Sequence, residues 1–236
     1  MELLRIHVVL DGVAPTVWRR LDVPRSMTLD RLHLVLQGAM GWTDAHVHEF
    51  ETVARDGSRH PQRYLPDDAL DDGEPGEREA TMPVGRLLGR PGDLLRYLYD
   101  AGDAWTHTLR LEQVVPALDA GPRCLGGGRA CPPEDCGGPT GYDRLLRVLA
   151  GERRRDAERF DVARAQAAIA RLLQEHPVRA TVGPVGDPTS RPGVPEEPQG
   201  GSRPGASDPS GPVDAMLLRA TRHRPQSLAE HVRRAP

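Results

Sequence analysis

The chain has 236 residues, a net charge of −3 and 31 basic residues, every one of which is arginine. Without lysine, a phosphate-binding loop of the G-x-x-x-x-G-K type and a lysine Schiff base are excluded. Neither half of the chain is strongly basic, so the charge balance does not favour non-specific binding to nucleic acid, which depends on neutralising several phosphates.

Features that would direct the chain to a membrane are missing from the sequence. No apolar run reaches 18 residues, which argues against a membrane-spanning helix. The first residues form a strand-like pattern instead of a basic and apolar leader, so we expect a cytoplasmic protein. Its three cysteines, an odd number, are then expected to be reduced thiols or metal ligands.

Composition divides the chain into two parts. Residues 177–212 hold 9 Pro and 7 Gly, and a segment of this kind cannot bury enough apolar surface to offset the entropy of ordering it. We therefore predict a folded domain over residues 1–176 and a disordered tail over residues 177–236. Within the tail, a weak helix is predicted near residues 216–234.

A hairpin and a helix are predicted first along the chain. Alternating apolar residues predict strands over Glu2–Leu10 and Val17–Val23, joined by a turn at Asp11–Pro15. Thr28 is a good N-cap, apolar residues then recur at helical spacing, and Gly41 stands where a helix-ending glycine belongs. The helix between these two residues has the clearest pattern in the chain.

A period of two returns in the middle of the sequence. It predicts a strand over His46–Val53 with a short partner at Arg59–Leu65, and an acidic loop follows at Pro66–Ala80. A second hairpin is predicted from Leu94–Asp100 and Ala104–Glu112, around a tight turn.

The remaining elements settle the fold class. A loop rich in glycine and proline holds every cysteine, and helices are predicted after it at Tyr142–Ala150 and Phe160–Glu175. The order is strand, strand, helix, strand, second hairpin, then helices, without the strand–helix alternation of a parallel sheet. We predict an α+β fold with a mainly antiparallel sheet and C-terminal helices packed on it.

Five stretches carry a family resemblance. They are Val17-Trp-Arg-Arg-Leu, the helix Thr28–Trp42 ending Met-Gly-Trp, His46-Val-His-Glu-Phe, Tyr99-Asp-Ala-Gly-Asp-Ala-Trp-Thr-His, and Cys131-Pro-Pro-Glu-Asp-Cys-Gly-Gly-Pro-Thr-Gly-Tyr142. In this order they closely resemble the plasmid pRiA4b open-reading-frame-three-like family, whose members are often labelled TnpR-like passenger proteins of insertion elements. The similarity runs from about Leu3 to Leu173. It implies a compact α+β domain and no particular activity, and Ala101 stands where the family usually has phenylalanine.

The cysteines predict a zinc site. Cys124, Cys131 and Cys136 are spaced C-x6-C-x4-C, and thiolates bind zinc tightly at tetrahedral sites that need a fourth ligand. His107 on the preceding hairpin is the first choice for that ligand and His48 the second. The alternative is three reduced thiols in a rigid loop.

The second hairpin offers candidates for acid–base chemistry. Asp100 and Asp103 flank the tight turn and His107 follows four residues later, so these side chains are candidate catalytic groups. The alternative is that both aspartates bind backbone amides of the turn and that His107 is a half-buried sheet residue. His46 and His48 could also ligate a metal together, although a partly buried polar strand face is the more frequent outcome.

From these features we expect a non-enzymatic interaction or accessory domain, associated with mobile DNA and binding another protein. One alternative is a metal-supported enzyme, hydrolytic in type, that uses Asp100, Asp103 and His107. The other is a DNA-binding accessory protein with Arg153–Arg155 and the arginines of the tail on phosphates.

Overall fold

The structure, a computed structural model, describes residues 1–53, 61–118, 121–149 and 152–177. The predicted disordered tail, apart from its first residue, and the weak helix near residues 216–234 lie outside the described residues. No helix among the described residues is long and apolar enough to cross a membrane.

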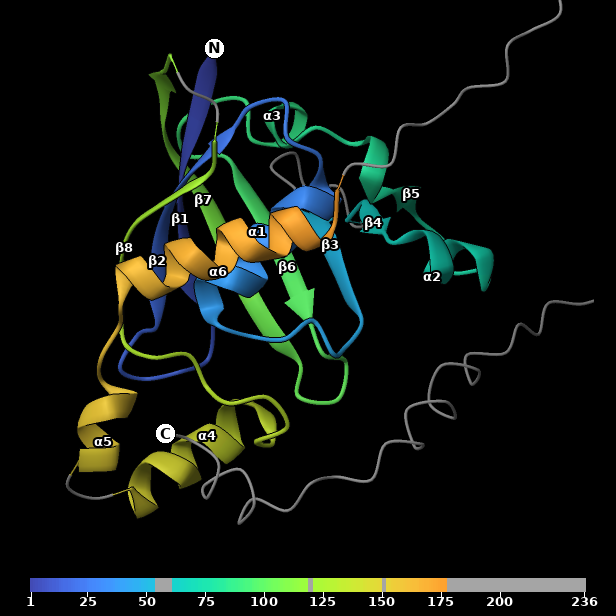
Figure 1. Cartoon of the computed structure of the whole chain (residues 1–236). Helices are drawn as coiled ribbons and strands as arrows, with labels where there is room; N and C mark the ends of the chain where they lie inside the picture. Colours follow the sequence, from blue (N-terminus) through green and yellow to red (C-terminus); the bar gives the residue numbers. More distant parts are fainter. Residues whose placement is uncertain (54–60, 119–120, 150–151, 178–236) are drawn as a thin grey trace, which may run out of the picture. The chain divides into compact units, whose positions relative to one another are not determined.

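One eight-stranded sheet organises the described chain (Figure 1). Its order is β5-β4-β3-β6-β7-β1-β2-β8, and every neighbouring pair is antiparallel except β4 and β5. The predicted α+β class with a mainly antiparallel sheet is thus confirmed. The strands are β1 (Glu2–Leu10), β2 (Trp18–Pro24), β3 (His48–Thr52), β4 (Arg63–Leu65), β5 (Glu77–Arg78), β6 (Leu94–Tyr99), β7 (Trp105–Pro116) and β8 (Arg123–Gly128).

The period of two explains why the central strands hold together. In β1, Leu4, Ile6 and Val8 are fully buried, because alternate side chains of a strand point to the same face. Ile6 pairs with Leu21 of β2 on one side and with Leu111 of β7 on the other. The apolar face of three adjacent strands is therefore continuous.

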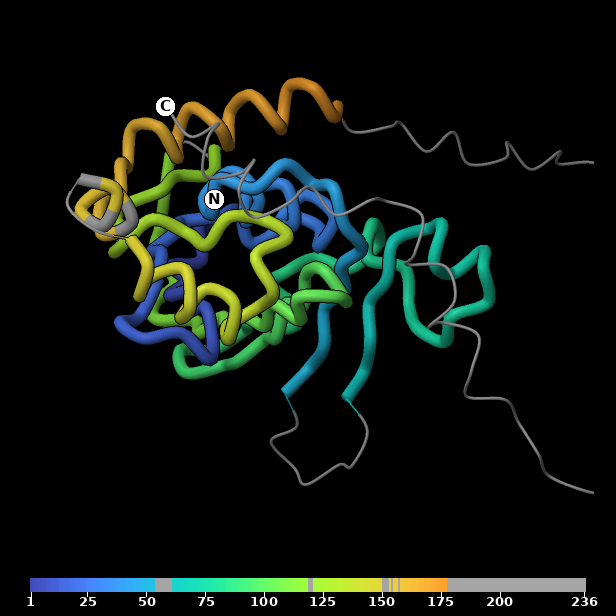
Figure 2. Tube along the Cα trace, turned by 90° about the horizontal axis from the view of Figure 1, so that it is seen from below, coloured from blue at the N-terminus to red at the C-terminus, as the bar shows by residue number. Residues whose placement is uncertain are grey.

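Two helices, α1 (Leu29–Met40) and α6 (Val162–Glu175), cover one face of this sheet (Figures 1 and 2). Gly38 lets them approach closely, because a Cβ there would lie 2.6 Å from the backbone nitrogen of Ile169. The helical segments are α1 (Leu29–Met40), α2 (Asp67–Asp71), the 3-10 turn η1 (Glu79–Thr81), α3 (Val84–Leu87), α4 (Gly138–Val148), α5 (Glu152–Ala157) and α6 (Val162–Glu175).

The predicted boundaries need four corrections. The helix expected at Tyr142 begins four residues earlier, at Gly138, and the last helix begins at Val162 because Asp161 accepts a hydrogen bond from the Arg164 amide as its N-cap. The acidic loop contains α2 and β5. Cys124 lies in β8 and not in a loop.

The glycine run of β8 explains the last of these errors. Gly126, Gly127 and Gly128 are typical of a loop, yet they pair with β2. A Cβ at Gly128 would lie 2.4 Å from Nε1 of Trp18, so the indole takes the space that a side chain would need. In this strand the glycines allow another residue to approach closely, and they do not form a turn. Residues 129–137, which follow, are called the cysteine loop below.

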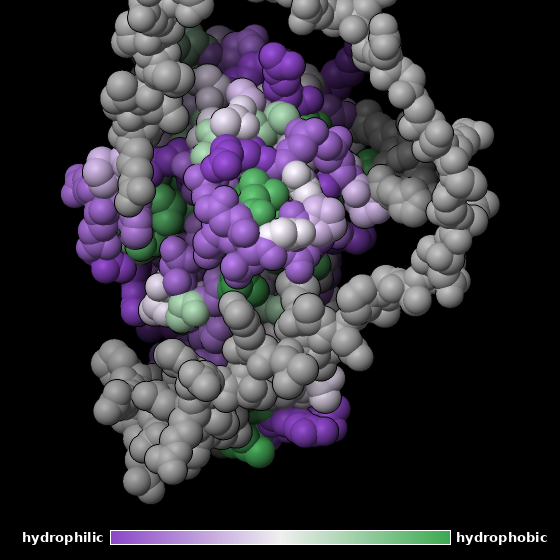
Figure 3. Space-filling model, turned by 90° about the vertical axis from the view of Figure 1, so that its right-hand side faces the viewer, coloured by the Kyte–Doolittle hydropathy of each residue, from purple (hydrophilic) through white to green (hydrophobic). Residues whose placement is uncertain are grey.

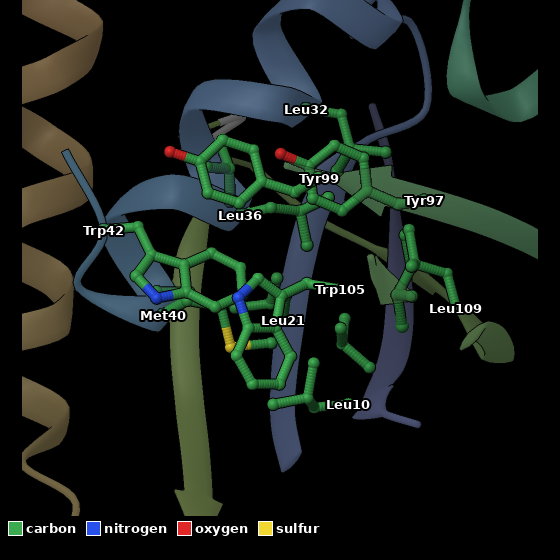
Figure 4. Packing of buried hydrophobic residues seen from close by; sticks show 14 of the residues in the cluster. Leu10, Leu21, Leu32, Leu36, Met40, Trp42, Tyr97, Tyr99, Trp105 and Leu109 are labelled. Atoms are coloured by element: carbon green, nitrogen blue, oxygen red, sulfur yellow. The ribbon is translucent and has the colours of Figure 1, made fainter. Parts of the chain in front are cut away.

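An aromatic group fills the core where β6 and β7 meet the end of α1 (Figure 4). The ring of Trp42 stacks on Tyr99 with centroids 4.9 Å apart and lies 6.1 Å from Trp105. Tyr97 and Tyr99 stack along β6. These rings hold the end of α1, the second hairpin and the cysteine loop in fixed relation.

On the face shown in Figure 3, hydrophilic residues predominate and hydrophobic ones form only small separate spots.

Candidate functional site

Motifs far apart in the sequence meet beside the aromatic group. Trp42 donates a hydrogen bond from Nε1 to the carbonyl of Pro132 at 2.9 Å, which fixes the cysteine loop to the end of α1. The amide of Gly137 donates to Oδ2 of Asp103 at 3.1 Å, which fixes the loop to the second hairpin. The stretches that carry the family resemblance therefore form one continuous region.

Glu134 anchors the middle of the cysteine loop. Its carboxylate accepts hydrogen bonds from the hydroxyl of Tyr99 at 2.5 Å and from that of Thr43 at 2.7 Å. Burial raises the pKa of Tyr99, and the nearby carboxylate raises it further, so the phenol is a permanent donor. A charge-assisted bond of this kind holds the loop firmly against β6.

A histidine and two carboxylates converge beside this anchor. His46, Asp100 and Asp135 each offer one ligand atom, and these three atoms lie within 4.8 Å of one another. Nε2 of His46 is 3.2 Å from Oδ1 of Asp135 and 3.7 Å from Oδ2 of Asp100. Their side chains are 25%, 9% and 53% exposed, so the group, called the His46 cluster below, opens to solvent on the side of Asp135.

The nitrogen at the centre of the His46 cluster lacks a satisfactory partner. Nε2 is buried and makes no hydrogen bond within the described parts of the chain, although Asp135 lies at ion-pair distance. Nε2 and the Asp135 oxygen are close enough for a hydrogen bond, but a short contact with unsuitable angles does not form one. A cation bound between the three side chains would give Nε2 a partner.

Asp100 has two functions in this arrangement. Its Oδ1 accepts hydrogen bonds from the amides of Gly102 and Asp103, at 2.9 and 3.2 Å, as the alternative interpretation of the sequence expected. Its other oxygen faces His46. The backbone of Asp100 is in the left-handed region with φ 60°, a conformation that aspartate tolerates better than most residues.

His107 lies away from solvent, in the core. It is fully buried against the rings of Trp42 and Tyr97, and its Nδ1 is 3.3 Å from the carbonyl of Tyr97. Burial lowers its pKa to about 4. The structure brings Asp100 together with His46, and His107 belongs to neither group of potential ligand atoms found among the described residues. A joint catalytic role for Asp100, Asp103 and His107 stays a prediction without geometric support here.

The three cysteines are free thiols. Burial raises the pKa of all three, that of Cys136 to about 12, which favours the protonated form over the thiolate that a metal requires. Neither group of potential metal ligands among the described residues includes a sulfur atom. Zinc bound by Cys124, Cys131 and Cys136 with His107 or His48 stays an untested prediction.

A second polar group lies between α1 and the sheet. Nε2 of His33 donates to Oδ1 of Asp44 at 2.7 Å, and its Nδ1 is 2.8 Å from the hydroxyl of Tyr97. Gln37 closes the ring, because its amide donates to that hydroxyl and its carbonyl oxygen accepts from the amide of Asp44. Burial lowers the pKa of His33, which supports a neutral ring that accepts from Tyr97.

His48 stacks on this ring of hydrogen bonds. Its imidazole lies parallel to that of His33 with centroids 3.5 Å apart, and its Nε2 is 3.0 Å from the buried carboxylate of Glu79. His33, Asp44 and His48 are close enough to suggest a metal site. However, a metal ion lies in the plane of each imidazole that binds it, and two stacked parallel planes share no such position. This group is therefore a hydrogen-bonded support.

A cavity of about 910 Å³ lies between the end of α1, the cysteine loop and the helices α4, α5 and α6. Asp135 lines it, so the His46 cluster stands at its edge. Its wall also includes Arg19, which is only 1% exposed. The size is that of a pocket for a small molecule.

Arg19 is a buried cation without a carboxylate. Nε donates to the carbonyl of Ala39, Nη1 donates to those of Trp18 and Gly128, and Cζ lies 3.9 Å from the ring centre of Phe160. Across the four described segments, no aspartate or glutamate forms an ion pair with it. Sequence reasoning missed this residue, although Arg19 falls on the same strand face as Val17 and Leu21, a signal that was available.

The comparisons with known proteins agree with this architecture. A family model described as "Plasmid pRiA4b ORF-3-like protein" matches residues 2–166. The chain is 40% identical over 150 residues to "Uncharacterized protein y4hQ" of Sinorhizobium fredii (strain NBRC 101917 / NGR234), a match that covers 63% of the chain and 74% of that protein. It is also similar to the crystal structure of "Protein of Unknown Function MM3350" from Methanosarcina mazei Go1, at 31% identity and a TM-score of 0.59, over 69% of this chain and 96% of the other.

Proposed function

We propose that this chain, which belongs to the plasmid pRiA4b ORF-3-like family, is a binding domain whose cavity takes up a small ligand with a carboxylate or phosphate group. The observation that supports this proposal is the buried guanidinium of Arg19 in the cavity wall. A ligand of this class would supply an ion-pair partner for Arg19, which the carboxylates among the described residues do not.

Electrostatics favour an anion at this position. A buried charge is costly unless it is paired, and the three carbonyl oxygens that accept from Arg19 carry only partial charges. Arginine remains protonated at neutral pH, and its planar fork matches a carboxylate or phosphate. Phe160 covers one face of the guanidinium and also lines the cavity, so an anion would approach in the plane of the fork.

The role of such a domain would be an accessory one. The family label suggests association with mobile DNA. A partner protein could bind as well, by inserting an anionic group of its own into the same cavity.

Calorimetric titration with inorganic phosphate and with citrate tests the proposal. We expect saturable binding that Arg19→Gln abolishes. Because Arg19→Gln also removes hydrogen bonds inside the fold, Ala168→Phe provides an independent test: it fills the cavity from α6 without changing the charge. Ala167→Phe, on the exposed side of the same helix, is the matched control and should bind like the parent. Absence of binding by the parent, or equal binding by Ala168→Phe, would overturn the proposal.

A metal-supported enzyme is the second candidate, because Asp135 belongs both to the cavity wall and to the His46 cluster. Turnover of a phosphate or carboxylate ester that depends on added divalent cation would favour it over simple binding. A DNA-binding role has less support. Arg153 and Arg155 are exposed, but exposed Asp156 and Glu158 lie beside them. Salt-sensitive retention on DNA would revive that role.

A further inference from the structure

The geometry points to a binding site for one divalent metal ion of the Mn²⁺ or Zn²⁺ class at the His46 cluster, with His46, Asp100 and Asp135 as its ligands. This inference goes beyond the proposed function, because it needs neither Arg19 nor a ligand in the cavity.

The spacing of the ligand atoms fits a metal ion with little movement. With bonds of about 2.1 Å, neighbouring ligands lie about 3.0 Å apart around an octahedral ion and about 3.4 Å apart around a tetrahedral one. Nε2 of His46 is 3.2 Å from Asp135 and 3.7 Å from Asp100. The ligand atoms of Asp100 and Asp135 lie within 4.8 Å of each other, so rotation of the aspartate side chains would bring all three atoms around one ion.

The environment of the cluster lacks another cation. Among the described residues, no arginine forms an ion pair with Asp100 or Asp135, and the one basic group facing both is His46 itself. The buried, unbonded Nε2 of His46 points to a missing partner. A buried nitrogen without a hydrogen bond is costly, and a metal ion would remove that cost while neutralising both carboxylates.

Neighbouring hydrogen bonds hold the ligands in position. The amides of Gly102 and Asp103 bind one oxygen of Asp100 and leave the other free to face His46. On the cysteine loop, Glu134 is tied to Tyr99 immediately before Asp135, and the Gly137 amide is tied to Asp103 shortly after it. Such supporting contacts orient metal ligands and raise affinity.

The ligand set also defines the kind of ion and the open positions. One imidazole nitrogen and two carboxylate oxygens suit Mn²⁺ and Zn²⁺ better than the softer ions that select thiolates. Three protein ligands leave at least one coordination position open, and the exposed Asp135 places it toward solvent and the cavity edge.

Metal titration of chelator-treated protein is the direct test. Mn²⁺ binding can be measured by electron paramagnetic resonance, and we expect one equivalent to bind. Bound Co²⁺ should give visible absorption bands but no thiolate charge-transfer band. His46→Gln and Asp135→Asn should each weaken Mn²⁺ binding at least tenfold. Asp135→Asn is more informative than a change at Asp100, because Asp100 also holds its own turn and replacing it could unfold the hairpin.

Controls separate this site from its rivals. Asp143→Asn, an exposed aspartate on α4, and Cys136→Ser should bind Mn²⁺ like the parent. A thiolate band with Co²⁺ that Cys136→Ser abolishes would transfer the metal to the cysteines and overturn the inference. Unchanged Mn²⁺ affinity in both His46→Gln and Asp135→Asn would also overturn it. Ala168→Phe should retain the metal while losing the anion, so the two proposals can fail separately.

Discussion

The imidazole of His33 lies face to face with that of His48, with 3.5 Å between centroids and 5° between planes. Each ring bonds a different carboxylate, Asp44 in one case and Glu79 in the other. The pair joins α1 to β3, because one histidine comes from each. The end of α1 lines the cavity, so the pair connects the cavity wall to the strand that directly follows the segment presenting His46.

His33→Phe should be destabilising although it preserves the stacked ring. The change removes the donor to Asp44 and the acceptor for Tyr97, and it leaves buried polar groups without partners. We expect the free energy of unfolding to fall by about 2–4 kcal/mol, measured by urea denaturation at pH 7. His7→Phe, at a half-buried position on β1, should change it little. A His33→Phe protein as stable as the parent would show that the ring of hydrogen bonds contributes nothing net.

His107 makes the fold sensitive to acid. Because burial lowers its folded-state pKa to about 4, the unfolded chain binds a proton that the folded chain does not, and stability is lost as pH falls from about 6.5 to about 4. This histidine alone should account for about 3 kcal/mol between pH 7 and pH 4. His107→Leu should flatten the pH dependence of unfolding by that amount. Leu109→Val, on the same strand, should shift stability equally at both pH values. An unchanged slope in His107→Leu would contradict the assignment.

Gly38 is required where α1 crosses α6. A methyl group at this position would lie 2.6 Å from the backbone nitrogen of Ile169, so Gly38→Ala must push the helices apart. We expect a loss of about 1–3 kcal/mol in the free energy of unfolding. At Gly89 the nearest atoms to an added Cβ are 3.8 Å away, and Gly89→Ala should be tolerated. Equal melting temperatures for the two variants would refute the close packing described.

Tyr99 and Glu134 should be energetically coupled. Tyr99→Phe removes the donor and Glu134→Ala the acceptor of the 2.5 Å hydrogen bond, so a double-mutant cycle should give a coupling energy of about 1–2 kcal/mol. Both variants should also weaken Mn²⁺ binding, because they release the loop that carries Asp135. Additive effects on stability would show that the loop is held by other contacts.

Local patterns account for what the sequence predicted correctly. Alternation in β1 and helical spacing in α1 are set by residues close together in the chain, and both elements appear where expected. Thr28 and Gly41 flank α1 at the predicted positions, with Gly41 in the left-handed conformation, although the Thr28 hydroxyl donates to Asp30 and makes no capping hydrogen bond. The sheet class followed from the order of these elements.

The His46 cluster depended on information that no local pattern contains. Asp100 and Asp135 reach His46 because the cysteine loop folds back over the second hairpin, a path fixed by Trp42 and Glu134. His107 was a candidate partner for the turn aspartates, and the alternation of β7 directs it into the core beside Trp42. Spacing alone did not reveal that His46 lies beside Asp100.

The interior position of β1 has a consequence for synthesis on the ribosome. Leu4 pairs with Val23 on one side, but on the other it pairs with Val114, 110 residues later. The first hairpin can form early, whereas the second edge of β1 stays unpaired until β7 has emerged, because long-range strand pairing must wait for both partners. During that interval an apolar strand is exposed to neighbouring nascent chains. Truncations that end before Pro116 should therefore aggregate, and the order of strands in the sheet makes the first strand translated one of the last to be completed.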